Sequence, residues 1–242
     1  KLTANAFLAQ RISSINSLSE LCEKTGADIE EVSKAIGMDS RIGNSFLKTS
    51  VGFGGSCFQK DILNLVYISR SIGLEKVANY WEQILIINTH QRDRFANKIN
   101  AIINKESLQK NVCIFGWSFK KDTNDTRESA AIYVANNLMK SNIYLNVYDP
   151  KVKRSQIYFD LNYINKNDAK NKRHVLVYDR HIDCIYQTNI IAILTEWDEF
   201  KEYDWEKIYD KMSKPAYVFD GRNVLEKEEL ESIGFNYIGL GR

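Results

Sequence analysis

The hydrophobic pattern changes once along this chain of 242 residues, near residue 110, and this change constrains the fold more than any other feature. Before it, apolar residues recur at helical spacing in residues 7–22 and 59–71, and the run 77–103 contains neither Gly nor Pro. After it, short apolar runs such as residues 112–116 alternate with helical stretches. The sequence therefore predicts a helical region followed by a region of strands and helices.

Strands that alternate with helices favour a parallel sheet covered by helices on both faces. The expected strands are residues 112–116, 144–150, 175–178, 190–195, 216–221 and 235–240, and the Lys- and Asn-rich residues 165–173 are expected to form a solvated loop. We therefore predict an α/β fold in which an all-helical domain, residues 1–108, is joined by a long helix to a Rossmann-like, doubly wound domain, residues 109–242. Ligands of such sheets bind outside the carboxyl ends of the strands. A flavodoxin-like domain without a ligand is the alternative.

Composition narrows the functional classes. Lys and Arg number 33 and Asp and Glu 31, so a formal charge of +2 gives no support for nucleic-acid binding through bulk charge. Apolar runs such as residues 190–194 are far shorter than a membrane span, and no signal peptide is evident. The cysteines, which are Cys22, Cys57, Cys113 and Cys184, form no CxxC pair and show no metal-ligand spacing with the histidines. We expect reduced thiols, a cytoplasmic location and no bound metal.

The segment VGFGGSCFQKD, residues 51–61, is the most informative part of the sequence. Its glycines allow the backbone to approach a ligand closely, and Cys57 follows them at the expected start of a helix. The positive end of that helix and Lys60 favour the thiolate form. Asp61 lies one turn further on the same face, so the pair suits a nucleophile and a base that orients water. A small buried cysteine after a structural turn is the alternative.

Lys1 and Asn5 are four residues apart in the first expected helix, so both project from one side of it. A cation and an amide donor in that arrangement can hold a developing oxyanion or a substrate hydroxyl. Side chains of these types also commonly just face solvent, so the pair alone does not separate the two interpretations.

The loop after the first expected strand is a second candidate site, although neither it nor any other segment supplies the GxGxxG fingerprint. Phe119 could stack on a base, Lys120 could contact its polar edge or a phosphate, and Arg127 could pair with a second anion. Arg222 follows a later strand in the sequence FDGR and could clamp a phosphate. A charged surface loop is the alternative interpretation.

Five blocks of the sequence match one known family when they are taken together. They are KLTAN at residues 1–5, GMDSRIG at 37–43, FLKTSVGFGGSCFQKD at 46–61, FKKDTNDTRES at 119–129 and FDGR at 219–222. On these blocks the chain resembles the UDP-glucose 6-dehydrogenase family in its animal-type form. The resemblance spans residues 1–241 and is interrupted mainly between residues 151 and 183. It implies NAD as cofactor, UDP-glucose as substrate, and self-association through the helical domain, which is the central domain of the family.

The family oxidises the C6 alcohol of UDP-glucose twice, through an aldehyde, to UDP-glucuronate, and passes two hydrides to NAD. By this resemblance, Cys57 attacks the aldehyde to give a thiohemiacetal, and loss of the second hydride leaves a thioester that water hydrolyses. Asp61 positions or activates that water. Lys1 and Asn5 stabilise the oxyanions at C6.

The resemblance also assigns binding residues. The positions implied for the sugar nucleotide are Lys1, Asn5, Arg41, Phe46, Lys48, Phe53, Gly54, Phe119, Lys120 and Arg222, and those implied for NAD are Cys57, Lys60 and Arg127. Within these sets, Phe119 and Lys120 would contact the uridine and Arg222 the pyrophosphate. Arg41 would reach into the site of a neighbouring subunit.

Two departures from the family pattern shape the functional expectation. The family carries an N-terminal dinucleotide-binding domain before the position of Lys1, so we expect a fragment that binds a UDP-sugar without turnover. Asn223 stands where animal forms commonly carry a second arginine, which weakens the expected anion clamp. One alternative is a related nucleotide-sugar 6-dehydrogenase acting on another sugar, such as GDP-mannose or a UDP-HexNAc. Another is a non-catalytic module that binds a UDP-sugar and dimerises.

Overall fold

Two units make up the computed structural model, which describes residues 1–242. Unit 1 comprises Lys1–Arg92 and Leu240–Arg242, and unit 2 comprises Asp93–Gly239. The division falls inside helix α4 (Glu75–Lys105), whereas the sequence pattern placed the domain boundary after residue 108. The return of the last three residues to unit 1 had no signal in the sequence pattern.

Helix α4 covers the predicted run 77–103 and extends slightly beyond it at both ends. Its C-terminal part packs within unit 2, where the rings of Phe95 and Phe219 lie 6.2 Å apart and Asn100 donates to the Ser141 hydroxyl at 3.1 Å. These contacts explain why the division precedes the end of the helix. No helix in the structure, α4 included, combines the length and the apolar character that a membrane crossing needs.

Unit 1 contains helices and loops only, as predicted. Besides the first part of α4, it contains α1 (Leu2–Thr25), α2 (Ile29–Gly37) and α3 (Phe58–Ser71). Helix α1 ends at Gly26, whose left-handed backbone lets its N–H donate to the Cys22 carbonyl. Asp28 caps α2 by accepting from the Glu30 N–H at 2.7 Å.

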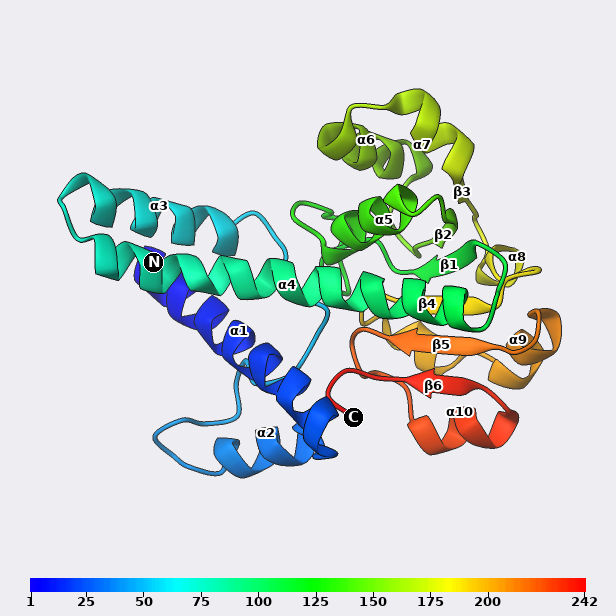
Figure 1. The fold of residues 1–242 in the computed structure, drawn as a ribbon, viewed down its shortest axis with the longest axis horizontal. Coiled ribbons are helices and arrows are strands. Elements are labelled where there is room, and N and C mark those ends of the chain that lie inside the picture. Colours follow the sequence, from blue (N-terminus) through cyan, green and yellow to red (C-terminus); the bar gives the residue numbers. More distant parts are fainter. The chain divides into compact units, whose positions relative to one another are not determined.

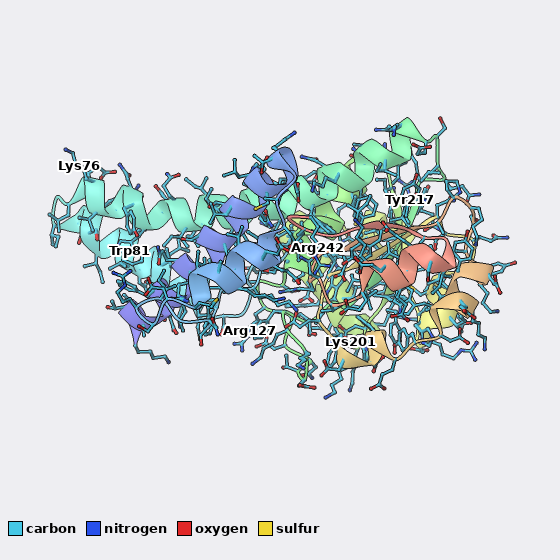
Figure 2. All side chains as sticks on the ribbon, turned by 90° about the horizontal axis from the view of Figure 1, so that it is seen from below. Lys76, Trp81, Arg127, Lys201, Tyr217 and Arg242 are labelled. Atoms are coloured by element: carbon cyan, nitrogen blue, oxygen red, sulfur yellow. A yellow bond between two sulfur atoms is a disulfide. The ribbon has the colours of Figure 1, made fainter.

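The core of unit 1 lies between α1, α3 and α4. Helices α1 and α3 contact each other, and small residues of α1, Ala6 and Ala9, are fully buried in the core they share. The buried cluster consists of Ala6, Ala9, Phe53, Ile62, Val66, Ala78 and Ile84. Beside it, Trp81 of α4 (Figure 2) contacts Phe7 with ring centroids 5.5 Å apart. Small side chains therefore set how closely α1 and α3 approach.

Unit 2 is built on a six-stranded parallel sheet. Its strands are β1 (Asn111–Phe115), β2 (Tyr144–Tyr148), β3 (Val175–Val177), β4 (Ile190–Ile193), β5 (Tyr217–Asp220) and β6 (Asn236–Ile238). Their order is β3-β2-β1-β4-β5-β6, which can be followed in Figure 1. The order reverses between β1 and β4, where Phe115 pairs with Ile193 at the carboxyl ends. The predicted doubly wound α/β fold is confirmed.

The helices of unit 2 cover both faces of the sheet. They are α5 (Ala130–Lys140), α6 (Arg154–Asn165), α7 (Asp168–His174), α8 (His181–Cys184), α9 (Trp205–Lys211) and α10 (Lys227–Ile233), with a 3₁₀ turn η1 (Asp198–Lys201). On one face, Trp205 of α9 and Leu230 of α10 share a core with Phe115, Ile193 and Val218. Phe219 follows Val218 in β5 and so points to the opposite face, where its ring lies near Phe95 of α4.

The expectation of four reduced thiols is wrong for two of them. Cys113 of β1 and Cys184 of α8 form a disulfide, with their Cα atoms 6.0 Å apart, while Cys22 and Cys57 are free. The two paired residues are 71 positions apart in the sequence. Only the crossover that packs α8 on the sheet brings them together, so their spacing gave no indication of the bond.

The C-terminal tail makes a tight backbone approach in unit 1. The Gly241 carbonyl accepts from the Ile29 N–H at 2.9 Å, and Arg242 (Figure 2) pairs with Glu30 of α2. Gly241 has φ +73°, and a Cβ there would lie 2.5 Å from Ile29 Cγ2 and 3.0 Å from Ser19 Cβ. Gly26 has nearly the same φ, +76°, but open space around its Cβ position.

We expect Gly241→Ala to lower the free energy of unfolding more than Gly26→Ala. Both alanines carry the strain of a left-handed backbone, about 1 kcal/mol, but only the one at position 241 collides with packed atoms, which adds about 1–3 kcal/mol. Urea unfolding of the two variants beside the wild type measures the difference. Equal losses would show that the tail is not packed as described.

Candidate active site

The predicted catalytic residues Asn5, Cys57 and Asp61 come together where α1 packs on α3. Cys57 occupies the N-cap position of α3, and Asp61 follows one turn later with its N–H donating to the Cys57 carbonyl at 2.9 Å. Asn5 of α1 donates from Nδ2 to Asp61 Oδ2 at 2.6 Å. Asp61 is 9% exposed, so this bond satisfies a largely buried carboxylate.

Cys57 is an exposed free thiol, which excludes the alternative of a buried structural cysteine. Its Sγ lies 3.8 Å from the Ser56 hydroxyl, and its side chain makes no capping bond to α3. The buried free cysteine is Cys22 in α1. A sulfur at the positive end of a helix, with an adjacent carboxylate, can act as a nucleophile.

Lys1 and Arg41 are two of the predicted cations of unit 1, and both are exposed. Lys1 precedes α1, and its carbonyl accepts from the Asn5 N–H at 3.0 Å. Arg41 pairs with Asp39 at 2.6 Å with 86% of its side chain exposed. This guanidinium lowers the pKa of Asp39. Arg41 contacts none of the residues around Cys57, so it is not part of that group within one chain.

The loop of residues 46–56 leads from α2 to Cys57 and contains the other predicted substrate residues. Phe46, with φ +62°, has its ring 6.5 Å from that of Phe58, while Lys48 is exposed. Phe53 is buried in the core and Gly54 is half-buried. The sequence interpretation missed the buried polar side chains that bind this loop's main chain.

A second group of predicted residues lies in unit 2 at the switch point between β1 and β4. The connection after β1 begins with Gly116, φ +91°, where a Cβ would lie 2.4 Å from Thr195 Cβ. The Thr195 hydroxyl donates to the Ser118 carbonyl at 2.6 Å, and the Phe119 N–H donates to the Asp125 carbonyl at 3.0 Å. This close approach ties the loops after β1 and β4 together.

Phe119, Lys120 and Arg222 meet at this edge of the sheet. Lys120 Nζ lies 5.6 Å from the centroid of the Phe119 ring. Arg222 donates from Nε to the Leu194 carbonyl at 2.8 Å and from Nη2 to the Phe119 carbonyl at 3.3 Å. It also pairs with Glu196 at 3.2 Å. Arg222 thus holds the loop that presents Phe119, and its charge is already partnered by Glu196.

The predicted NAD-contacting cations, Lys60 and Arg127, are both exposed. Arg127 lies on the connection after β1 (Figure 2) and pairs with Asp125 at 2.6 Å. Its guanidinium lowers the pKa of Asp125. These cations fit contacts with phosphates, but they do not form a dinucleotide cradle by themselves.

Asp149, which the sequence interpretation missed, fixes the loop after β1. It follows β2, and its Oδ2 accepts from the Trp117 N–H at 2.6 Å, the Ser118 N–H at 3.0 Å and Trp197 Nε1 at 3.2 Å. Its Oδ1 accepts from two further N–H groups at 2.9 Å. In dinucleotide-binding sheets an acidic residue near this position binds a ribose. Here both oxygens are occupied by the protein, so the sheet lacks that acid.

Asp220 plays the same role in the loop that carries Arg222. It is fully buried and accepts from the N–H groups of Arg222 at 3.0 Å, Val224 at 2.8 Å and Leu225 at 2.9 Å. Burial raises the pKa of this carboxyl group. Three main-chain donors on one carboxylate define the turn after β5.

Two sequence models of one family match this chain. The central domain of the UDP-glucose/GDP-mannose dehydrogenase family matches residues 1–90, and the UDP binding domain of the same family matches residues 113–227. The chain therefore belongs to the UDP-glucose/GDP-mannose dehydrogenase family, and the predicted resemblance is confirmed. The helical unit corresponds to the first match, and the sheet with its loops to the second.

Relatives with assigned names agree with this family. The chain is 53% identical to UDP-glucose 6-dehydrogenase of Bos taurus and 50% identical to that of Drosophila melanogaster, over its whole length. It spans only 50% and 51% of those two proteins. A solved UDP-glucose dehydrogenase from Pyrobaculum islandicum superposes with a TM-score of 0.78 at 27% identity, covering 99% of this chain and 49% of that one.

We expect Asp149→Asn to loosen the loop that presents Phe119. An amide nitrogen cannot accept the three bonds made by Oδ2, so buried donors lose their acceptor and the free energy of unfolding falls by about 2–3 kcal/mol. Urea unfolding of the variant and the wild type measures this loss of free energy. Asp168→Asn, which removes an exposed carboxylate paired with Lys172, serves as the control and should leave stability close to the wild type. Equal effects of the two changes would contradict the role of Asp149.

Proposed function

We propose that the protein containing this chain oxidises UDP-glucose to UDP-glucuronate with NAD as hydride acceptor. The observation that carries the proposal is the exposed thiol of Cys57, placed at the start of α3 one turn before Asp61. This group lies in a chain that matches UDP-glucose 6-dehydrogenases over its whole length. Because the chain spans half of those relatives, the activity is assigned to the whole protein.

The chemistry explains why a dehydrogenase needs a thiol. An aldehyde has no second hydride to give until a nucleophile adds to its carbonyl carbon. Addition of the Cys57 sulfur makes a thiohemiacetal, and its oxidation leaves a thioester that water can hydrolyse. Asp61 orients that water while Asn5 holds the carboxylate in place at 2.6 Å. The second N–H of Asn5 and the ammonium of Lys1 stabilise the oxyanion at C6.

The loops of unit 2 bind the uridine end of the substrate in this proposal. Phe119 stacks on the base, Lys120 contacts its polar edge, and Arg222 positions the loop and lies near the pyrophosphate. Asn223 lacks the charge that a second arginine would bring. In unit 1, Phe46, Lys48, Phe53 and Gly54 contact the sugar nucleotide.

NAD, when bound, accepts the hydride. Lys60 and Arg127 are the residues of this chain suited to contact it, since both cations are exposed. The sheet of unit 2 does not offer a second dinucleotide site, because Asp149 is fully engaged with main-chain and indole donors. We place the reaction in the cytoplasm, where Cys57 remains a thiol. The disulfide between Cys113 and Cys184 is fully buried in unit 2.

An exposed apolar surface on α3 and α4 supports self-association. Its members, all at least 42% exposed, are Leu63, Tyr67, Ile68, Ile72, Leu74, Val77 and Tyr80. A contiguous group of large apolar side chains in water usually marks an interface. We propose that two copies of the chain meet through this surface. In such a dimer Arg41, which is unattached to its own chain's Cys57 group, contributes to the neighbouring site.

We expect Cys57→Ser to abolish acid formation and to leave UDP-glucose binding within about twofold of the wild type. The hydroxyl lacks the thiolate's nucleophilicity, so formation of UDP-glucuronate by the intact protein should fall on the order of 10³-fold. Calorimetry measures the affinity for UDP-glucose, and chromatography of the acid product measures its rate of formation. Cys22→Ala, at a buried cysteine of α1, is the control and should keep full activity. Unchanged product yield from Cys57→Ser would rule out the covalent step.

We expect Tyr67→Lys to weaken self-association, because it introduces like charges into two facing apolar surfaces. The dimer dissociation constant should rise at least about tenfold, as measured by sedimentation velocity at several concentrations. Phe159→Lys in α6 is the matched control, since that side chain is 64% exposed in unit 2. A dimer that tolerates the change at Tyr67 would contradict the proposed interface.

A further inference from the structure

We propose that Asn88 is a positioning residue that fixes the main chain of residues 49–53 for the sugar end of the substrate. This inference rests on the proposed function and extends it to a residue that touches neither substrate nor thiol. Asn88 lies in α4, and no feature of the sequence around it singles it out.

The carboxamide of Asn88 forms a reciprocal pair with the main chain of Phe53. The Phe53 N–H donates to Oδ1 at 2.9 Å, and Nδ2 donates to the Phe53 carbonyl at 3.1 Å. One helical turn later, Arg92 donates from Nη2 to the same carbonyl at 2.6 Å. Asn88 is 2% exposed and Arg92 4%. Both main-chain groups of Phe53 are therefore bound by one buried face of α4.

The neighbouring residues of the loop are held in the same way. Gln91, on the same face of α4, donates to the Ser50 carbonyl at 2.9 Å. From α1, Asn16 Oδ1 accepts from the Ser50 N–H at 2.9 Å and from the Thr49 hydroxyl at 3.0 Å. This loop has no strand or helix to satisfy its main chain, so side chains from α1 and α4 take that role.

Gly52 shows how closely the loop is fitted to α4. Its φ is +123°, and a Cβ at this position would lie 2.8 Å from Asn88 Oδ1 and 3.3 Å from Arg92 Cγ. The first glycine of the VGFGGSC segment is therefore required by the approach of Asn88 rather than only by a turn. A conspicuous sequence feature and an inconspicuous buried amide belong to one arrangement.

Holding the loop with Asn88 and Arg92 buries polar and charged groups, which apolar side chains packed over the same loop would avoid. Burying an amide and a guanidinium is unfavourable unless each finds partners, and apolar side chains could cover the loop without that demand. Side chains that fix main-chain atoms give a precise position instead. Phe53 lies four residues before Cys57, so a shift of its main chain also moves the segment that presents the thiol. Small displacements at that distance from a reacting atom can reduce rates strongly.

The test compares the affinity of the protein for UDP-glucose and for UDP by calorimetry. Asn88→Ala removes both hydrogen bonds to Phe53, so UDP-glucose should bind about tenfold more weakly. UDP, which lacks the sugar, should change by less than about threefold, since its contacts belong to unit 2. Asn88→Asp keeps the acceptor for the Phe53 N–H and loses the donor to the Phe53 carbonyl. The affinity of this variant for UDP-glucose should therefore lie between that of the wild type and that of Asn88→Ala.

Ser13→Ala is the matched control, because Ser13 is equally buried and its hydroxyl donates to the Ile84 carbonyl, one turn before Asn88. It should lower stability without changing either affinity. Parallel losses for UDP-glucose and UDP in Asn88→Ala would indicate loss of structure and would overturn the positioning role, as would an unchanged UDP-glucose affinity. A wild-type protein that binds no UDP-glucose would instead overturn the proposed function itself.

Discussion

The packing of α1 against α3 in unit 1 and the hydrogen bond from Asn5 to Asp61 depend on each other. The bond connects α1 to α3 at 2.6 Å, and it partners a carboxylate that is only 9% exposed. Such a charge is stable inside the fold only when a donor reaches it. Ala6 and Ala9 are small enough to let α1 approach α3, which brings that donor into range. The helix packing therefore decides whether a buried carboxylate can be accommodated one turn from Cys57.

In unit 2 the same principle governs the loops. Asp149 and Asp220 each accept from several main-chain N–H groups, and Arg222 donates to two main-chain carbonyls. These loops lie outside the strands, so no ladder of hydrogen bonds can define them. Buried charges define them instead, and Glu196 balances the one positive charge among them. The apolar core fixes the sheet, while a few polar atoms fix the loops at the carboxyl ends of its strands.

The sequence predicted what depends on local periodicity and missed what depends on long-range contacts. Six strands and the long helix followed from hydrophobic spacing, and the exposed thiol from its place after glycines. Asn88 and Asp149 carried no local signal, because their roles depend on segments more than thirty residues away. Residues 165–173 were expected to be a loop, yet α7 begins there because Asn167 caps it and Asn165 pairs with Asn171. The partner of Cys113 was hidden for the same reason.

The state of the acid after β2 decides what a sheet of this strand order can bind. The order predicts a nucleotide at the switch point, and the loops after β1, β4 and β5 do converge there. A dinucleotide would need a free carboxylate to hold a ribose and a glycine-rich turn to admit a pyrophosphate. Both oxygens of Asp149 instead accept from main-chain N–H groups, and Oδ2 binds the loop that presents Phe119 and Lys120. Because both oxygens of Asp149 accept from the protein, the switch point of this sheet lacks the free carboxylate with which a dinucleotide site holds a ribose.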